Sequence, residues 1–380
     1  MILTLTANPS LDRTIEVPGP VLRGQVQRAV WAGQQPGGKG VNVSRAVAAA
    51  DRDTLAVLPG DIDDPVLTGL DAIGLAHRSV PTGTPLRSNI TVTEPDGTTT
   101  KINEPGSPLS PQAQDELLDL VAEQAVGASW VVLAGSLPPG VDDDFYARAI
   151  KRIRQLDRPP LIAVDTSGAP LAAALMASPD LIKPNAEELA ELLNAAGLLH
   201  ASGLRDDSDP RDAVESLGTA ELHTIADRLE SSPQLTARAT STLLNARGPR
   251  PRSILATLGA GGAVLAQPDA AWHAQHPPTD VVSTVGAGDS TLAGYLLGLT
   301  GGREPDAALA RAVAYGAAAA RLRGTGVPSP ADTRTDAVTV TSLETSAAPL
   351  TGSPTAHTDT HTDDTSHRHE GTAPEAEEAR

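Results

Sequence analysis

A glycine-rich string that ends in a carboxylate, Gly286-Ala287-Gly288-Asp289, precedes an apolar stretch with helical spacing over residues 292–299. Small residues at a helix start let successive backbone N–H groups point at an anion, and the helix dipole favours negative charge there. A carboxylate at the same place can accept the proton of an attacking hydroxyl. Capping of the helix by Asp289 would require neither glycine. The string therefore predicts a site for phosphoryl transfer.

Two other glycine-rich strings suggest nucleotide loops but depart from the known patterns. Residues 33–40 have the spacing of a Walker phosphate loop, yet Gly40 stands where a Ser or Thr should follow the lysine. Residues 259–262 follow an apolar strand as a dinucleotide turn does, but Val264 occupies the place of the third glycine. A second strand and a turn follow there instead of a helix. Neither string by itself supports a P-loop or a Rossmann fold.

Composition and charge exclude several classes of protein. Hydrophobic residues make up 40% of the 380 residues, and no apolar run approaches the ~20 residues that a membrane-spanning helix needs. A net charge of −18 argues against nucleic-acid or anionic-membrane partners but permits a local basic pocket. Because the chain has no cysteine, disulfides and thiolate sites are excluded. The first residues lack the pattern of a secretory signal, so we expect a cytoplasmic protein.

Short apolar runs alternate with amphipathic stretches along the chain. This alternation predicts a doubly wound α/β fold, with a mostly parallel central sheet between two layers of helices. Unbroken apolar runs are typical of strands that are buried on both faces. We expect strands at residues 2–5, 54–58, 130–134, 161–164, 180–183 and 254–258. We expect helices at residues 41–50, 111–126, 143–155, 186–196, 290–299 and 305–323.

Four segments depart from this alternation. Residues 14–30 and 86–103 have the pattern of short alternating strands, the second with an Asp-Gly turn, and they predict a small projecting β-lid. A homodimer could cover the open strand edges of such a lid. Residues 197–234 are polar, which predicts an inserted surface loop before a helix near residue 235. We expect residues 334–380 to form a disordered acidic tail with four histidines.

Several strings along the chain together resemble the signatures of one enzyme family. They lie at residues 3–14, 36–45, 100–106, 134–141, 183–189 and 279–290. In this order they resemble the ribokinase-like (PfkB-type) carbohydrate kinases, most of all the 1-phosphofructokinase branch. The resemblance covers residues 1–333 apart from the expected insertion. It implies a ribokinase-like three-layer α/β/α sandwich with a projecting β-lid.

The resemblance also implies roles for particular residues in phosphoryl transfer from ATP to a sugar phosphate. Asp289 would be the general base, while the N–H groups of Gly286, Ala287 and Gly288 would stabilise charge on the transferred group. An arginine and a lysine can bind the phosphate that the sugar already carries, one as a planar fork and the other as a point charge. The residues implied to bind the sugar phosphate are Asp12, Gly37, Gly38, Lys39, Asn42, Arg87 and Ser136, with Arg87, Lys39 and Ser136 at that phosphate.

The nucleotide and its Mg²⁺ are implied to bind two further strings. Asn185 and Glu188 would organise Mg²⁺ largely through water, which suits a cation that sheds its hydration shell reluctantly. A solvated glutamate in the first turn of a helix is the alternative for Glu188. The residues implied to bind the nucleotide are Lys183, Asn185, Thr257, Gly259 and Gly262.

The resemblance favours fructose 1-phosphate as substrate and fructose 1,6-bisphosphate as product. The alternatives within the family are a 6-phosphofructokinase and a tagatose-6-phosphate kinase. A sugar-phosphate sensor without activity is another alternative, against which Asp289 and its two glycines argue. A nicotinamide-dependent oxidoreductase rests only on the loop at residues 259–262.

Overall fold

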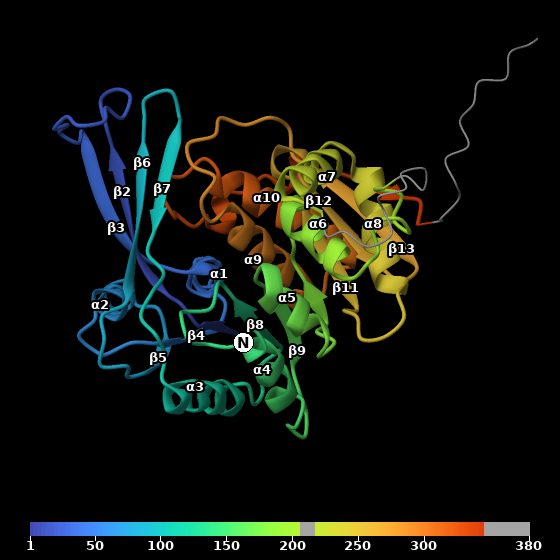
Figure 1. Cartoon of the computed structure of the whole chain (residues 1–380), viewed down its shortest axis with the longest axis horizontal. Helices are drawn as coiled ribbons and strands as arrows, with labels where there is room; N and C mark the ends of the chain where they lie inside the picture. Colours follow the sequence, from blue (N-terminus) through green and yellow to red (C-terminus); the bar gives the residue numbers. More distant parts are fainter. Residues whose placement is uncertain (206–216, 346–380) are drawn as a thin grey trace, which may run out of the picture. The chain divides into compact units, whose positions relative to one another are not determined.

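The structure is a computed structural model that describes residues 1–205 and 217–345, and within these ranges ten strands form one sheet. The strands are β1 (Ile2–Thr6), β4 (Thr54–Pro59), β5 (His77–Val80), β8 (Trp130–Ala134), β9 (Leu161–Asp165), β10 (Leu181–Ile182), β11 (Ser253–Thr257), β12 (Ala263–Gln267), β13 (Ala270–Gln275) and β14 (Thr339–Leu343). Their order is β14-β13-β12-β11-β10-β9-β8-β1-β4-β5 (Figure 1). Pairing from β5 to β11 is parallel, and β12, β13 and β14 extend the sheet as antiparallel strands.

Helices cover both faces of this sheet. In the described ranges they are α1 (Lys39–Ala48), α2 (Pro65–Ala72), α3 (Pro111–Gln124), α4 (Phe145–Ile153), α5 (Gly168–Leu175), α6 (Ala186–Ala195), α7 (Thr219–Ser231), α8 (Pro233–Asn245), α9 (Ala287–Thr300) and α10 (Pro305–Ala319). Strand β1 shows why two layers form, because its side chains alternate between the faces. Leu3 and Leu5 pack in the core cluster that includes α3 to α8, and Ile2 packs in the cluster with α1, α9 and α10. The expected three-layer α/β/α sandwich is confirmed.

Local sequence signals explain where several helices begin. The Ser110 side chain accepts a hydrogen bond from the Ala113 N–H at 3.1 Å, and Pro111 occupies the first turn of α3. Asp64 caps α2 in the same way, with its Oδ1 accepting from the Val66 N–H at 2.8 Å. All six expected strands and all six expected helices are present; the strand at residues 130–134 has the expected bounds, and the other elements differ at one or both ends.

A second sheet of four strands forms the lid, seen in blue and cyan in Figure 1. Its strands are β2 (Ser10–Glu16), β3 (Trp31–Gly37), β6 (Arg87–Thr93) and β7 (Thr99–Asn103), in the order β3-β2-β6-β7. The expected hairpin is confirmed, since Gly97 has a φ of 88° and its N–H donates to the Glu94 carbonyl at 3.0 Å. The prediction of strands within residues 14–30 is wrong in its bounds. Pro18 and Pro20 lack the N–H that a ladder needs, so the strands lie on either side of that segment.

The expected surface insertion also differs from the structure. Residues 219–231 of the expected surface insertion form helix α7, which packs into the core through Ile225, Ala226 and Leu229. This spacing places the three apolar side chains on one face, although Asp and Ser dominate the segment before them. Residues 206–216 of that insertion lie outside the described residues.

The C-terminal boundary of the folded part lies later than expected. Strand β14 pairs with β13, so the prediction of a disordered tail from residue 334 is wrong for residues 334–345. β-branched side chains favour an edge strand here, and Val340 packs against the sheet although the segment is mostly polar. The four tail histidines lie outside the described residues. In the described part, no helix has the length and apolar character needed to cross a bilayer.

Candidate active site

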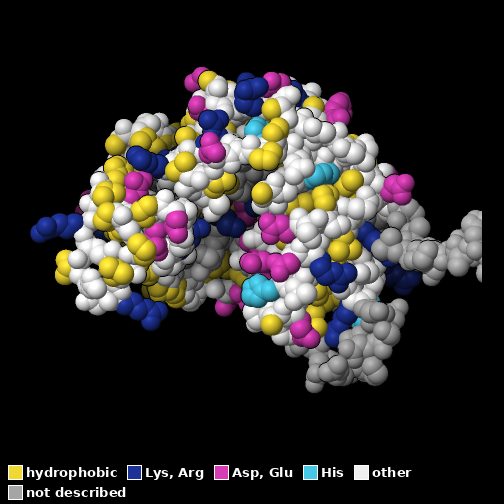
Figure 2. Space-filling view, turned by 90° about the horizontal axis from the view of Figure 1, so that it is seen from above, with side chains coloured by type: hydrophobic (Ala, Val, Ile, Leu, Met, Phe, Trp, Pro, Cys, Tyr) yellow, Lys and Arg dark blue, Asp and Glu magenta, His cyan; other side chains and the backbone are white. Residues whose placement is uncertain are grey.

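A cavity of about 950 Å³ lies between the lid and the carboxyl ends of the parallel strands. Figure 2 shows it as a hollow between the lid on the left and the larger part of the protein, with acidic and basic side chains at its mouth. Ligands of open parallel sheets bind at this edge, because the strand ends and helix starts meet there. The site residues expected from the sequence that line the cavity are Asp12, Gly38, Lys39, Asn42, Arg87, Lys183, Asn185, Glu188, Thr257, Gly259, Gly262, Gly286, Ala287, Gly288 and Asp289.

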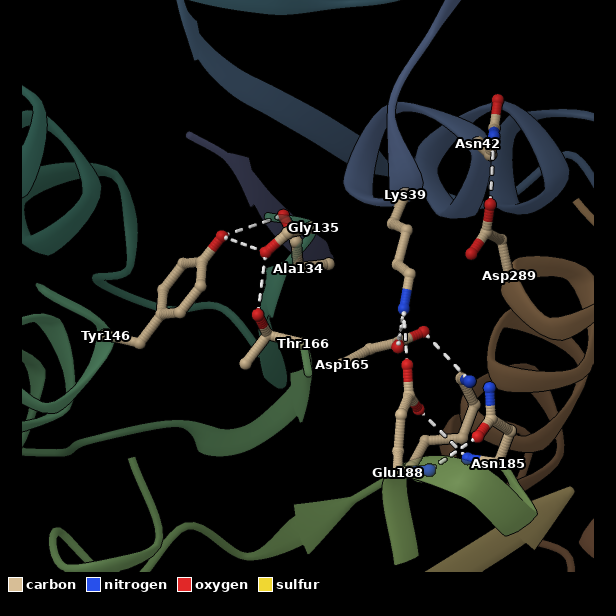
Figure 3. A network of polar contacts seen from close by, with 11 residues as sticks. Lys39, Asn42, Ala134, Gly135, Tyr146, Asp165, Thr166, Asn185, Glu188 and Asp289 are labelled. Carbon is tan, nitrogen blue, oxygen red and sulfur yellow. Dashed lines mark hydrogen bonds and ion pairs between the residues drawn. The ribbon is translucent and has the colours of Figure 1, made fainter. Parts of the chain in front are cut away.

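Asp289 lies in the first turn of α9 and is 7% exposed. Gly286 precedes this turn with a φ of 78°, a left-handed conformation that favours glycine. The Asn42 side chain donates from Nδ2 to Asp289 Oδ2 at 2.9 Å (Figure 3). Burial, and then the charge of Asp165, raise the pKa of Asp289 to about 6, against the opposing effect of Lys39, Asn42 and Lys183. A carboxylate with this pKa can both accept and release a proton near neutral pH.

Two lysines converge on the buried carboxylate of Asp165, which ends β9. Figure 3 shows Lys39 pointing toward this carboxylate. Lys39 Nζ lies 2.7 Å from Asp165 Oδ1, and Lys183 Nζ lies 3.1 Å from Asp165 Oδ2. Burial acts to raise the pKa of Asp165, but the charges of Lys183 and Lys39 outweigh it and hold that pKa below its ordinary value. Both ammonium groups thus lie beside a buried carboxylate at the cavity.

The sequence analysis did not identify Asp165. An Asp-Thr pair directly after an apolar run marks the carboxyl end of β9, and that position could have indicated a site residue. Lys39 was expected beside Arg87, but it contacts Asp165 and lies 3.6 Å from Glu188 Oε1. Among the described residues it shares no hydrogen-bond partner with Arg87. Because Lys39 and Arg87 both line the cavity, their joint binding of one phosphate stays a prediction.

Asn185 and Glu188 form a capping box at the start of α6. The Glu188 N–H donates to Asn185 Oδ1 at 2.8 Å, and the Asn185 N–H donates to Glu188 Oε2 at 2.9 Å. These bonds satisfy two N–H groups that a helix start otherwise leaves unpaired. The capping box holds the Glu188 side chain at the cavity beside Lys39. The side chain therefore does not extend into solvent, as a glutamate in the first turn of a helix otherwise can.

The donors and acceptors on the lid face the cavity from β2 and β6. Arg87 donates to the backbone carbonyls of Glu104 and Asn8, each at 3.0 Å, while its buried Nε has no acceptor within the described ranges. Asn89 donates to Asp12 Oδ1 at 3.1 Å, and its own buried Oδ1 is also unpaired there. Because side chains two apart in a strand share a face, Arg87 predicts Asn89 as a site residue that the sequence analysis missed. These unpaired atoms can bind the polar groups of a ligand.

Two expected substrate residues do not line the cavity. Gly37 ends β3, and a Cβ there would collide with the Asp12 carboxylate, so its small size makes room for Asp12. Ser136 lies next to Asn8, whose Nδ2 is 3.5 Å from Ser136 Oγ. Ser136 is thus connected to Arg87 through Asn8, and Gly37 acts through Asp12.

Close packing within the protein explains why two positions near Thr257 are glycines, without a bound nucleotide. Gly262 has a φ of 87°, and a Cβ there would collide with the backbone carbonyl of Ala274 in β13. Gly259 has a φ of 50°, and a Cβ there would collide with the Glu230 carboxylate of α7. Close packing against β13 and α7 therefore accounts for these two glycines, while Thr257, Gly259 and Gly262 still line the cavity.

The described residues contain no group of three or more His, Asp or Glu side chains arranged to hold a metal ion. Mg²⁺ usually keeps several waters and binds phosphate oxygens together with one or two carboxylates. The Glu188 side chain is 12% exposed, its Oε2 accepts the Asn185 N–H, and its Oε1 is ion-paired with Lys39 at 3.6 Å, so it fits contact with the waters of a hydrated ion. The site thus fits Mg²⁺ that arrives with a phosphorylated ligand.

Comparison with known proteins agrees with this geometry. The sequence profile described as pfkB family carbohydrate kinase matches residues 5–332. The 1-phosphofructokinase of Haloferax volcanii is 33% identical over 341 residues, which cover 88% of this chain and 96% of that protein.

Two solved structures share the fold. Phosphofructokinase-2 from Escherichia coli, solved with substrates and products, has a TM-score of 0.71 at 27% identity, covering 88% of this chain and 97% of its own. Ribokinase from Thermotoga maritima has a TM-score of 0.60 at 17% identity, covering 87% and 97%, and shows the ribokinase-like fold alone. The chain therefore belongs to the pfkB family of carbohydrate kinases, enzymes that transfer a phosphoryl group to a hydroxyl.

Proposed function

We propose that the chain transfers the γ-phosphoryl group of ATP to the C6 hydroxyl of fructose 1-phosphate, giving fructose 1,6-bisphosphate and ADP. Family membership supports a sugar-phosphate kinase that uses ATP, and the name of the Haloferax volcanii relative supports this substrate. The observation that carries the proposal is the buried carboxylate of Asp289 at a glycine-lined helix start, in a cavity shared with the lid.

Asp289 acts in this mechanism as the general base. It accepts the proton of the C6 hydroxyl while the oxygen–phosphorus bond to the sugar forms and the bond from phosphorus to the bridging oxygen of ADP breaks. Its pKa of about 6 leaves the carboxylate mostly ionised at neutral pH. Asn42 holds one carboxylate oxygen through its hydrogen bond and leaves the other oxygen for the substrate.

The transferred phosphoryl group meets three sources of positive potential. Gly286, Ala287 and Gly288 bring backbone N–H groups to the start of α9, where a helix leaves most of its first N–H groups without a partner inside the helix. The Ala287 N–H makes a long hydrogen bond of 3.4 Å to the Thr284 carbonyl. Lys39 and Lys183, both held by Asp165, add two ammonium groups. Mg²⁺ bound with the nucleotide would neutralise charge on the phosphate oxygens, with Glu188 and Asn185 as the residues near it. Thr257, Gly259 and Gly262 form the surface on which the nucleotide lies.

The lid supplies recognition of the sugar phosphate. Asp12 and Asn89 accept and donate hydrogen bonds to sugar hydroxyls, with the Gly38 backbone beside them. The unpaired Nε of Arg87 is the donor for the phosphate of the substrate, and Ser136 keeps Asn8 in place behind it. In this proposal the phosphate of the sugar binds at the lid and the reacting hydroxyl lies at Asp289.

An ADP-release assay with four acceptors tests the proposal. Purified protein is given ATP and Mg²⁺ with fructose 1-phosphate, fructose 6-phosphate, tagatose 6-phosphate or fructose, and Asp289→Asn is the matched control. We expect the highest kcat/KM for fructose 1-phosphate and little turnover of fructose. A higher kcat/KM for either 6-phosphate would assign the chain to that activity instead. Binding of a sugar phosphate without ADP release would favour the sensor.

We further propose that two copies pair through their lids. Strands β3 and β7 are the outer strands of the lid, and no strand in the described ranges pairs with their open edges. Trp31 on β3 is 36% exposed, and Ile102 on β7 is 58% exposed. Light scattering on the purified chain should give twice the mass of one chain, and a monomer at micromolar concentration would refute the pairing.

A further inference from the structure

Arg45 lies one helical turn after Asn42 on α1 and contacts three separate segments. Its Nη1 donates to the Asn42 side-chain oxygen at 3.3 Å and to the Thr325 backbone carbonyl at 3.0 Å. The same nitrogen lies 3.4 Å from the Pro36 carbonyl, and Nη2 donates to Gln35 Oε1 at 3.0 Å. Arg45 therefore ties α1 to lid strand β3 and to the loop after α10.

The contact with Arg45 decides which way the Asn42 amide faces. An asparagine side chain has an oxygen and a nitrogen of nearly equal size, so its hydrogen-bond partners determine its orientation. A guanidinium can only donate, so the amide must turn its oxygen toward Arg45. The nitrogen then faces Asp289, where it donates to Oδ2 at 2.9 Å.

We infer that Arg45 is a positioning residue for the proposed kinase reaction, because its guanidinium locks the Asn42 amide with the nitrogen toward the Asp289 carboxylate. The inference rests on the proposed role of Asp289 as the base. Arg45 itself does not line the cavity, so it acts through Asn42.

The same contacts link the base to the lid. Gln35, which accepts from Arg45, lies directly opposite Asp12 in the pairing of β3 with β2. The Thr325 hydroxyl also donates to Gln35 Oε1, at 3.1 Å, so the lid end of the network has two donors. The hydrogen bonds of Arg45 thus connect the strand pair that carries Asp12 with the Asn42 amide, which in turn donates to Asp289.

Loss of Arg45 changes the surroundings of Asp289 in a defined direction. Once freed, the amide can rotate and place its oxygen against the carboxylate, and two acceptors repel unless the carboxyl group is protonated. The charged groups that face Asp289 are Lys39 from α1, Asp165 from β9 and Lys183 after β10, and none of them is altered by the substitution. The pKa of Asp289 should therefore rise.

The test compares Arg45→Met with Arg45→Lys and with Arg311→Met. Arg311 is a matched control, because it packs over Tyr315 on α10 and does not line the cavity. For Arg45→Met we expect kcat to fall by about 10- to 150-fold, the range for losing a hydrogen bond to a charged group. The KM for ATP should change less than twofold. Arg45→Lys should recover part of kcat, since an ammonium can donate to Asn42 but lacks the fork that also reaches Gln35.

A second readout does not depend on turnover. The pKa of Asp289 is followed by carbon NMR on protein labelled at aspartate carboxyl groups, with Asp289→Asn identifying the signal. A higher pKa in Arg45→Met, with a lower kcat, supports the inference. An unchanged pKa overturns it even if kcat falls. If the wild-type protein shows no kinase activity, the proposed function fails while the NMR comparison still decides the role of Arg45.

Folding is controlled with thermal melting of each variant. If Arg45→Met does not fold, Gln35→Met takes its place, because it removes the lid acceptor of Arg45 and leaves the guanidinium present. This variant should show a smaller fall in kcat in the same direction. Wild-type kcat and an unchanged pKa of Asp289 in Gln35→Met would overturn the link to the lid.

Discussion

Replacing the Asp289 carboxylate with an amide should abolish most turnover while making the protein more stable. An amide cannot accept the proton of a hydroxyl, and loss of a general base typically lowers kcat by ~10²–10⁴-fold. The Asn42 Nδ2 that donates to Asp289 Oδ2 at 2.9 Å can donate equally to an asparagine oxygen. The fold and the cavity should therefore be preserved in Asp289→Asn.

The pKa of Asp289 sets the pH dependence of both activity and stability. With a pKa of about 6, the base is roughly 90% ionised at pH 7 and roughly 10% at pH 5, so kcat/KM should fall about tenfold per pH unit below 6. Folding raises this pKa from 3.8, so the folded state holds the proton more tightly than the unfolded state. The contribution of Asp289 to the free energy of unfolding therefore declines by roughly 3 kcal/mol as the pH rises from about 4 to about 6.

Two measurements separate these effects. Steady-state kinetics from pH 5 to pH 8 should show the acidic limb in the wild type and a flat, low profile in Asp289→Asn. Urea unfolding at pH 7.5 should give the variant a larger free energy of unfolding than the wild type, and the difference should shrink at pH 4.5. A variant with near-wild-type kcat would remove Asp289 from the mechanism. A variant that is less stable than the wild type at pH 7.5 would contradict the cost assigned to the buried charge.

Three further changes test other parts of the structure. Arg87→Ala should lower kcat/KM for the sugar phosphate by about 10- to 150-fold, mostly through KM, with partial recovery in Arg87→Lys; an equal loss on unphosphorylated fructose would refute the phosphate contact. Gly262→Ala should lower the melting temperature, because its Cβ would collide with the Ala274 carbonyl and its φ is 87°; an unchanged melting temperature would refute this. A chain that ends at residue 333 should melt below one that ends at residue 345, since only the longer one keeps β14 on β13; equal melting temperatures would show that β14 adds no stability.

The buried parallel strands could be predicted because their signal is local. Unbroken apolar runs such as residues 130–134 and 161–164 are buried on both faces of the sheet, so each run indicates its own strand. The lid is different, because β2 is mostly polar and half-exposed, while β3 is largely exposed and contains two glycines and a proline, so neither strand has a clear apolar pattern. Their positions depend on the ladder that pairs β2 with both β3 and β6, which no local pattern reveals.

Edge elements were misplaced for a related reason. Strand β14 consists of Thr, Val, Ser and Leu residues, and most of its side chains are exposed or half-exposed. Its β structure comes from pairing with β13, which lies more than sixty residues earlier in the chain. Helix α7 was likewise hidden, because its three core side chains form a narrow apolar face in a polar segment.

Only part of the candidate site could be predicted from local sequence patterns. Gly286 and Gly288 mark the helix start that we propose binds an anion, because a left-handed turn and an open amide surface both require small residues. The partners of Asp289 come from elsewhere: Asn42 is 247 positions away, and Asp165 belongs to a different strand. The pKa of a buried carboxylate depends on the charged and hydrogen-bonding groups around it, and the order of strands in the sheet determines which groups these are. The sequence can therefore point to Asp289 as the proposed base, but the pKa and the orientation of its carboxylate follow only from the fold.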